Sequence, residues 1–208
     1  MIGTMPTTKG TIDLDVLLAW GASFKQVGKG DLIFSEGTCC RFYHQLVWGS
    51  VRLMNIDDDG RVYVHSFIEP GESFGEFPLF DDGLFATAAF AETDSLVIRL
   101  RKETFLHLME ENNALQMEMT RTLARRLRFK FFIIECLANP SPEIRLLRLL
   151  KYFKEEGRHL EPGSNQLMLT RQQLAELLGL RVETVIRAIR HLHDEGSVKV
   201  MDRKIYLQ

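Results

Sequence analysis

The chain has 208 residues, of which 45% are hydrophobic and 26% are charged, and its formal net charge is -2. This length suits one large domain or two modest ones, and this composition excludes a disordered chain. No apolar run approaches the roughly 20 residues that span a bilayer, and the first residues lack a signal-peptide pattern, so we expect a cytoplasmic protein.

The charges divide the chain into two unlike parts. Residues 1–120 contain 9 Lys or Arg against 18 Asp or Glu, whereas residues 121–208 contain 17 against 10. A basic C-terminal part indicates contact with a polyanion such as nucleic acid. Two unequal solvated surfaces would produce the same counts, so charge alone leaves that alternative open.

The N-terminal part reads as short strands. Turn signals recur at 28–31, 36–38, 57–60, 69–72 and 81–83. Segments 50–56 and 61–67 between them alternate, or nearly alternate, in polarity, as half-buried strands do. We expect a small all-β barrel or jelly roll, with an apolar helix over residues 13–20 packed on it.

After Arg101 the pattern becomes helical, first over 102–112 and then over 114–137, where 24 residues contain no Gly or Pro. A coiled-coil spacing on the long helix predicts a dimer interface. Its residues are Leu123, Leu127, Lys130, Ile134 and Leu137. A second stripe, of Phe129, Phe132, Ile133 and Cys136, is expected to cover the β-roll. A helix buried within a monomer is the alternative.

The C-terminal part predicts a winged helix-turn-helix. Pro140 ends the long helix, and Ser141 caps the next one. Thr170 and Gln173 form a capping box for a further helix, which stops at Gly179 and is followed by another helix from Val182. Two short strands over 196–207 would form the wing. The predicted fold class is therefore α+β, a β-roll (double-stranded jelly roll), a long dimerisation helix and a winged helix-turn-helix.

The second helix of the motif carries the side chains suited to reading bases. Arg187 can donate two hydrogen bonds to guanine, Glu183 can accept from cytosine N4, and Ile186 suits a thymine methyl group. Phosphates suit the cations Arg171, Arg190, Lys199, Arg203 and Lys204. The alternative is that Glu183 and Arg187 merely form an i,i+4 ion pair on an exposed helix.

Three stretches of this sequence resemble the CRP/FNR family of bacterial transcription regulators. They are "GESFGEFPLFDDG" at 71–83, "LARRL" at 123–127 and "LTRQQLAELLGLRVETVIRAIRHL" at 169–192. The resemblance implies a homodimer on a near-palindromic operator in double-stranded DNA, with contacts to RNA polymerase, and no enzyme activity. It implies domains at 1–112 (effector), 113–138 (dimerisation helix) and 139–208 (DNA binding).

The family's base-reading Glu and Arg fall on Glu183 and Arg187, and "VET" at 182–184 is similar to the FNR branch, which favours a TTGA-like half-site. The full set of residues expected to bind DNA is Thr170, Arg171, Gln172, Arg181, Glu183, Thr184, Ile186, Arg187, Arg190 and Lys204.

The resemblance also places an effector pocket in the β-roll, but the Arg that would bind the phosphate of a cyclic nucleotide is missing. Cyclic-nucleotide-binding members have an Arg ten residues after the Glu of a Gly-Glu step; here Glu76 is followed at that distance by Ala86, then by Thr87. An adenine-contacting pair aligns with Lys130 and Phe131. The candidate pocket residues are Gly75, Glu76, Phe85, Ala86, Thr87, Lys130 and Phe131. We therefore expect a signal other than a cyclic nucleotide, or no ligand.

The cysteines and histidines indicate no cofactor. Cys39, Cys40 and Cys136 lack the spacing of a disulfide framework or a metal site, and we expect them to be small buried hydrophobic residues. A cyclic-nucleotide sensor, or a haem sensor using His44 or His65, stays as the alternative. A cupin-type enzyme is remote, because the histidines lack an H-x-H spacing.

Overall fold

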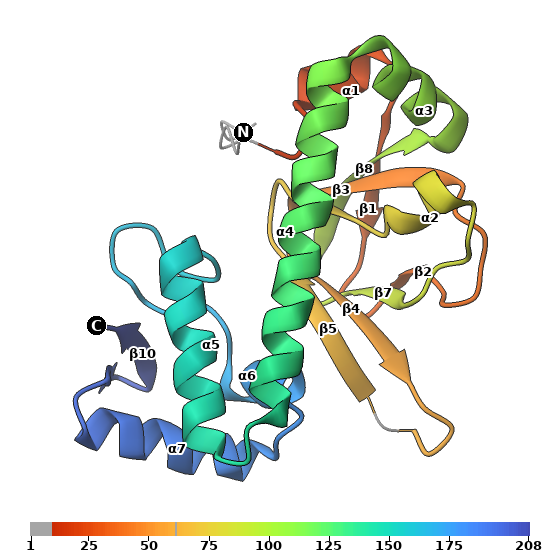
Figure 1. Ribbon diagram of the computed structural model, residues 1–208. Coiled ribbons are helices and arrows are strands. Elements are labelled where there is room, and N and C mark those ends of the chain that lie inside the picture. The colour runs from red at the N-terminus through yellow and green to blue at the C-terminus, as the bar shows by residue number, and fades with distance from the viewer. Residues whose placement is uncertain (1–9, 61) are drawn as a thin grey trace. The chain divides into compact units, whose positions relative to one another are not determined.

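The computed structural model describes residues 10–60 and 62–208 (Figure 1). The chain divides into two compact units, Met1–Ala124 and Arg125–Gln208. Its α+β class agrees with the prediction. The first nine residues of the predicted domain 1–112, and Arg61 in the predicted strand 61–67, lie outside the described residues. No described helix has both the length and the apolar character of a membrane span.

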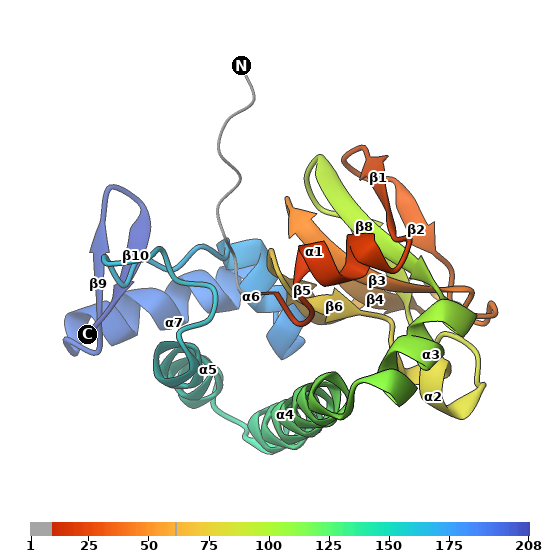
Figure 2. The ribbon, with the colours of Figure 1, turned by 90° about the horizontal axis from the view of Figure 1, so that it is seen from above.

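Two four-stranded antiparallel sheets form the β-roll of the first unit, as predicted (Figure 2). The first sheet has the order β1-β8-β3-β6, with bounds Ser23–Val27, Ser95–Arg101, Phe42–Trp48 and Ser73–Phe74. The second has the order β2-β7-β4-β5, with bounds Leu32–Phe34, Ala88–Ala91, Val51–Ile56 and Val62–Ile68. Strands distant in sequence therefore pair side by side, so each sheet brings together side chains from separate segments.

Three short helices accompany the roll: α1 (Leu14–Ala19), α2 (Phe77–Asp81) and α3 (Lys102–Glu111). The Asp13 carboxylate caps α1 by accepting from the backbone N–H of Asp15. On α3, Phe105 is fully buried and its ring stacks on Tyr43 of β3, with 4.8 Å between the ring centroids. The predicted helices over 13–20 and 102–112 are both present.

The long helix α4 (Asn113–Ala138) has an exposed apolar stripe and a packed one. Leu127 and Ile134, from the predicted dimer interface, are 58% and 63% exposed. On Tyr152 of α5 (Pro142–Glu156), the Phe132 ring stacks with centroids 4.6 Å apart, and the Phe129 ring packs at a tilt with centroids 5.1 Å apart. The second stripe thus packs on α5, a partner that the sequence analysis did not foresee.

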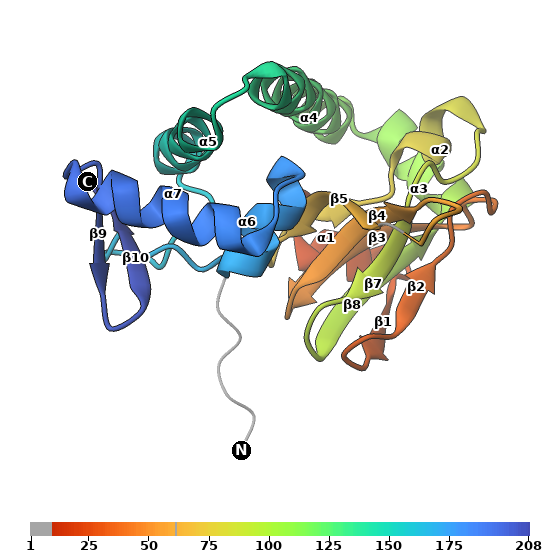
Figure 3. The same ribbon diagram turned by 90° about the horizontal axis from the view of Figure 1, so that it is seen from below.

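The second unit contains a three-helix core and a hairpin (Figure 3). After α5 come α6 (Arg171–Leu178), α7 (Val182–Asp194), β9 (Val198–Met201) and β10 (Lys204–Leu207). The Ser141 hydroxyl caps α5, as predicted, by accepting from the backbone N–H of Ile144 at 3.3 Å. The residues that close the core are fully or almost fully buried and include Leu146, Leu149, Phe153, Leu174, Leu178, Val185 and Ile189.

The cysteines follow the prediction only in part. Cys40 and Cys136 are buried, and burial is the main reason that the pKa of each thiol is raised. Cys39 is exposed, which corrects the expectation that all three are buried. It lies in the loop after β2, where its backbone bridges to Leu84 and its side chain is left toward solvent.

Gly75 is a position in the roll where a side chain cannot fit without displacing its neighbours. Its φ is +67°, and a Cβ there would lie 2.5 Å from Phe34 Cζ and 3.0 Å from Phe85 Cε1. The two rings stack face to face, with centroids 3.8 Å apart and planes inclined by 8°. An added methyl group would have to displace this aromatic pair inside a packed interior.

Gly75→Ala should therefore lower the free energy of unfolding by about 2 to 4 kcal/mol, from backbone strain plus overpacking. The measurement is urea denaturation of purified protein. Gly30→Ala is the matched control, because Gly30 has a φ of +85° with nothing within 4 Å of an added Cβ. A loss at Gly75 no larger than the loss at Gly30 would contradict the proposed clash.

Candidate functional site

A capping box and a glycine turn hold α6 and α7 in register. The Thr170 hydroxyl accepts from the backbone N–H of Gln173 at 3.2 Å, and the Gln173 side chain accepts from the backbone N–H of Thr170 at 2.8 Å. Gly179 ends α6 with a φ of +58°, a left-handed conformation that glycine adopts without strain. The chain then turns and enters α7 at Val182, as the sequence predicts.

The two faces of α7 differ sharply in burial. Val185, Ala188, Ile189 and Leu192 are buried against the core of the unit. Glu183, Ile186, Arg187 and Arg190 are exposed on the other side, because offsets of three, four and seven residues share one helical face. The structure thus brings together the four outward side chains that the sequence assigned to base and phosphate contacts.

Glu183 and Arg187 do not pair with each other. Within residues 10–60 and 62–208, no ion pair joins these two side chains, although their i,i+4 spacing would permit one. The alternative of a simple surface ion pair therefore has no support in the structure. Both side chains remain available to hydrogen-bond with a partner.

Arg171 has a structural contact in addition to its predicted phosphate contact. Its guanidinium Nη1 donates to the backbone carbonyl of Arg203 at 3.0 Å. Arg203 and Asp202 form the turn between β9 and β10, with φ of +63° and +47°. Arg171 thereby ties the start of α6 to the tip of the wing. Sequence reasoning missed this link, because 32 residues separate the donor from the acceptor.

Most of the predicted DNA-contacting side chains are accessible. Arg171 and Thr184 are half-buried, and the exposed members are Thr170, Gln172, Arg181, Glu183, Ile186, Arg187, Arg190 and Lys204. Lys199 and Arg203 of the wing are also exposed. One surface of the unit can thus offer both hydrogen-bonding side chains and cations.

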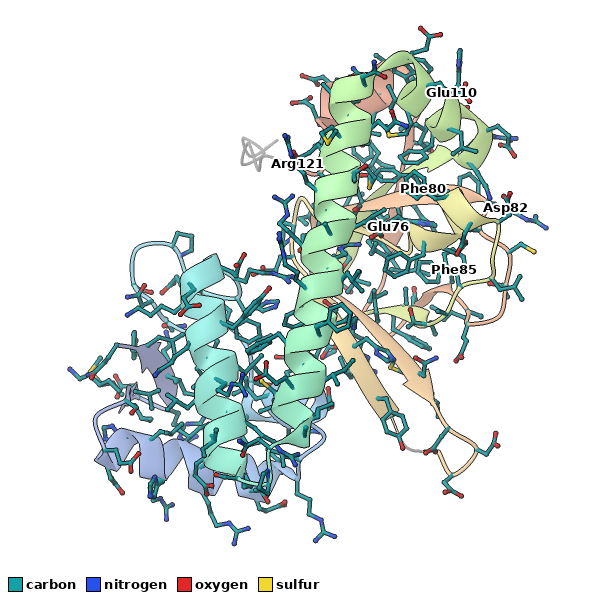
Figure 4. All side chains as sticks on the ribbon, in the orientation of Figure 1. Glu76, Phe80, Asp82, Phe85, Glu110 and Arg121 are labelled. Atoms are coloured by element: carbon teal, nitrogen blue, oxygen red, sulfur yellow. The ribbon has the colours of Figure 1, made fainter. Side chains whose placement is uncertain are left out.

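Two of the predicted effector residues, Glu76 and Phe85, lie in the β-roll beside Gly75 (Figure 4). Glu76, which begins α2, is 1% exposed. Phe85 is held through its backbone, since its carbonyl accepts from Gly37 N–H at 2.8 Å and its N–H donates to Thr38 at 3.0 Å. These bonds seat the Phe85 ring on Phe34, a residue that the sequence analysis did not single out.

The remaining predicted pocket residues are more dispersed. The Ala86 carbonyl accepts from Asn55 Nδ2 at 2.9 Å, while its side chain is exposed and Thr87 is half-buried. Lys130 and Phe131 belong to the second unit, so their part in an effector pocket stays a prediction. Burial and, to a lesser extent, the nearby charge of Arg126 together lower the pKa of the Lys130 ammonium to about 8.

His44 is a buried histidine that the sequence analysis mentioned only as a haem alternative. It is 6% exposed and lies among the rings of Phe34, Phe42 and Phe74. Burial lowers the pKa of its imidazole to about 3, with added repulsion from Arg99 and Lys25. In the described residues, no three His, Cys, Asp or Glu side chains gather as a metal site.

His44 should make the protein less stable in acid. The unfolded chain takes up a proton on His44 below a pKa of about 6.5, whereas the folded chain keeps the ring neutral down to about 3. The free energy of unfolding should therefore fall between these two pH values. In urea denaturation, His44→Phe should make the free energy of unfolding decline less steeply over this pH range. Above pH 7 the difference in free energy of unfolding between the variant and the natural protein should be constant. An unchanged slope would show that His44 is not buried as a neutral ring.

Comparison with known proteins matches both units. The model of the cyclic nucleotide-binding domain matches residues 24–112, and the model of the Crp-like helix-turn-helix domain matches residues 144–208. The "cAMP-activated global transcriptional regulator CRP" of Pasteurella multocida is 27% identical over 201 residues, which are 94% of this chain and 96% of that protein. The "Cyclic AMP receptor protein" of Thermus thermophilus is 28% identical over 172 residues, which are 83% of this chain and 77% of that protein.

A solved structure of similar fold covers almost the same length. FixK2 from Bradyrhizobium japonicum superposes with a TM-score of 0.74 at 25% identity, covering 90% of this chain and 92% of that one. The first domain model covers the β-roll and the second covers the helix-turn-helix, in the order of the chain. The chain belongs to the CRP/FNR family of DNA-binding transcription regulators, whose members are not enzymes and usually act as dimers.

Proposed function

We propose that this regulator binds a near-palindromic site in double-stranded DNA as a homodimer, and that its β-roll answers to a signal other than a cyclic nucleotide or acts without a ligand. The observation that carries the DNA-reading part is the outward face of α7. That face presents Glu183, Ile186 and Arg187 without an ion pair between the two charged residues in the described chain.

We assign base reading to the first two turns of α7. In a helix-turn-helix the N-terminal residues of the second helix lie against base edges in the major groove. Arg187 would donate two hydrogen bonds to guanine O6 and N7, and Glu183 would accept from cytosine N4. Ile186, at 39% exposure, offers an apolar surface to a thymine methyl group. These chemistries suit a TTGA-like half-site.

Cations around α7 would fix the register of the protein on DNA. Arg190 lies one turn beyond the base readers, and Lys199, Arg203 and Lys204 lie on or beside the exposed wing. Contacts of such residues with phosphates position a protein but carry no sequence information directly. Thr170, Gln172 and Arg181, exposed at the start of each helix, complete the proposed contact surface with the partly buried Arg171 and Thr184.

The proposed dimer uses the exposed stripe of α4. Leu127, Ile134 and Leu137 are exposed, and Leu123 and Lys130 of the same predicted interface are half-buried. Apolar side chains at this spacing favour pairing with a second helix, which would remove them from water. Two copies of α7 would then meet half-sites about one helical turn, roughly 34 Å, apart.

The β-roll argues against a cyclic nucleotide in two ways. Ala86 stands where cyclic-nucleotide-binding members have an Arg, so the bidentate partner of the phosphate is absent. The stacked rings of Phe34 and Phe85 also fill the space beside Gly75 of the Gly-Glu step. The relatives named for cyclic AMP therefore share the fold, and we propose that their ligand is not shared.

A location and one further partner follow from the proposed role. A regulator of this kind acts where bacterial DNA is transcribed, so we place it in the cytoplasm with RNA polymerase as a further partner. Segment 155–166, from the end of α5 into the loop before α6, is mostly exposed, and we propose it as the surface for such a contact.

Arg187→Ala should cost on the order of 1 to 3 kcal/mol of DNA-binding free energy at one base position of the operator. Lys204→Ala is the matched control, since losing a phosphate contact should weaken all sequences alike. Titration of the protein's own promoter region and of random duplex DNA, at one moderate salt concentration, measures both. Equal losses on specific and random DNA for Arg187→Ala would remove Arg187 from base reading.

Cyclic AMP should not bind the purified protein. The measurement is isothermal calorimetry, and the expected result is no heat beyond dilution, because the phosphate has no Arg partner. Ala86→Arg tests the same point in reverse, but the stacked Phe34 and Phe85 rings should keep its gain small. Micromolar binding by the natural protein would show that another cation replaces the missing Arg.

A further inference from the structure

The first unit contains a cavity of about 250 Å³, and Phe85 is the one candidate effector residue among those that line it. Strands β1, β2, β3 and β8, together with the loop after β2 and Phe85, line it, and it is open to solvent on one side. Its lining consists of Lys25, Ile33, Phe34, Thr38, Cys39, Arg41, Phe42, His44, Phe85, Val97 and Arg99. All of these residues lie in one compact unit, so the cavity is complete within the β-roll.

The polar part of this lining is cationic. Lys25, Arg41 and Arg99 contribute three positive charges, and the lining contains no Asp or Glu. In the described part of the chain none of the three cations takes part in an ion pair. Residues 1–120 nevertheless carry an excess of acidic side chains. A cationic cavity inside an acidic domain concentrates anions, because the charges that line it share one sign.

Two buried nitrogen atoms of the lining lack a hydrogen-bond partner. They are Nδ1 of His44 and Nε of Arg99, and neither is reached by solvent. His44 as a whole is 6% exposed. A buried polar atom without a partner costs about 1 to 3 kcal/mol. Because both atoms are covered, a ligand in the cavity would reach these two side chains through their other atoms.

The rest of the lining is apolar and aromatic. The Phe34 and Phe85 rings stack on each other, and the Arg99 guanidinium lies 4.9 Å from the centroid of the Phe42 ring. Ile33 and Val97 add aliphatic surface. Small-molecule sites commonly combine such walls with a few polar groups that fix the orientation of the ligand.

We propose that this cavity binds a small organic anion, a carboxylate or a phosphate monoester that also carries an apolar group. The anionic group would contact Lys25, Arg41 and Arg99, and the apolar group would lie against Phe34 and Phe85. This inference deepens the proposed function by naming the class of effector, and as an effector site it rests on that proposed function.

The energetics favour an anion over a neutral ligand. Lys25, Arg41 and Arg99 place three positive charges on the cavity lining, with no Asp or Glu among its residues. Burial is the main reason that the pKa of His44 is low, and repulsion from Arg99 and Lys25 acts in the same direction. An anion would offset the positive charges of the lining and would form charge-assisted hydrogen bonds, which are about twice as strong as neutral ones. A neutral ligand of the same shape would gain only the apolar contact.

The test uses the full-length protein, without DNA, in isothermal calorimetry against phenyl phosphate, benzoate and benzyl alcohol. At least one of the two anions should bind with a Kd of about 1 mM or tighter, and benzyl alcohol about tenfold more weakly. A preference for phenyl phosphate would identify a phosphate ester, and a preference for benzoate a carboxylate. No heat from either anion, or equal binding of benzyl alcohol, would overturn the proposal.

Variants locate the site. Arg99→Gln should weaken binding of the preferred anion about tenfold, because it removes one charge-assisted contact. Lys25→Gln, at a position closer to the surface, should weaken it in the same direction. Arg101→Gln is the matched control: Arg101 lies two residues along β8, is exposed and does not line the cavity. A control loss as large as that of Arg99→Gln would overturn the assignment.

A separate readout distinguishes this site from the regulatory proposal. Calorimetry without DNA reports only on the cavity, whereas titration of promoter DNA by the unliganded protein reports only on the helix-turn-helix. Anion binding without sequence-specific DNA binding would contradict the proposed function and leave the cavity assignment intact. Sequence-specific DNA binding without anion binding would contradict the cavity assignment alone.

Discussion

The approach of the Phe34 and Phe85 rings to the backbone of Gly75 is the contact on which the β-roll interior depends. It requires glycine at position 75, because any Cβ would lie 2.5 Å from the Phe34 ring. The backbone of Phe85 is held to Gly37 and Thr38, so the ring has little freedom to leave. The aromatic pair occupies the space beside the Gly-Glu step and also lines the cationic cavity. The packing of these two rings therefore bears both on the proposed loss of cyclic-nucleotide binding and on the proposed binding of a small organic anion.

An equivalent constraint operates in the second unit. Burial of Val185, Ala188, Ile189 and Leu192 fixes the rotation of α7 about its own axis. Because the helical period places Glu183, Ile186 and Arg187 on the opposite side, the same burial presents them to solvent. Arg171 holds the wing turn beside this surface through the carbonyl of Arg203. The surface that we propose for DNA is therefore a consequence of the packing of the core.

Local signals made most of the fold predictable. Caps at Ser141 and Thr170, the turn at Gly179, and the helical and alternating patterns act over a few residues, so each can be read without knowing the fold. The packing of Phe129 and Phe132 on Tyr152 could not be read in this way. An apolar stripe shows that a helix has a partner, but several surfaces can satisfy it equally well. The exposure of Cys39 likewise depends on the path of a loop.

The sequence by itself determined the order of the β-roll, the long helix and the helix-turn-helix. It also determined which side chains of α7 face outward, and that position 86 lacks an Arg. Only the tertiary structure decided where charge gathers inside the roll. Lys25, Arg41 and Arg99 come from separate segments. Antiparallel pairing of β1 with β8 and of β8 with β3 brings these segments together around the cavity. Such pairing depends on hydrogen bonds between strands far apart in the chain, and no short-range pattern reports it.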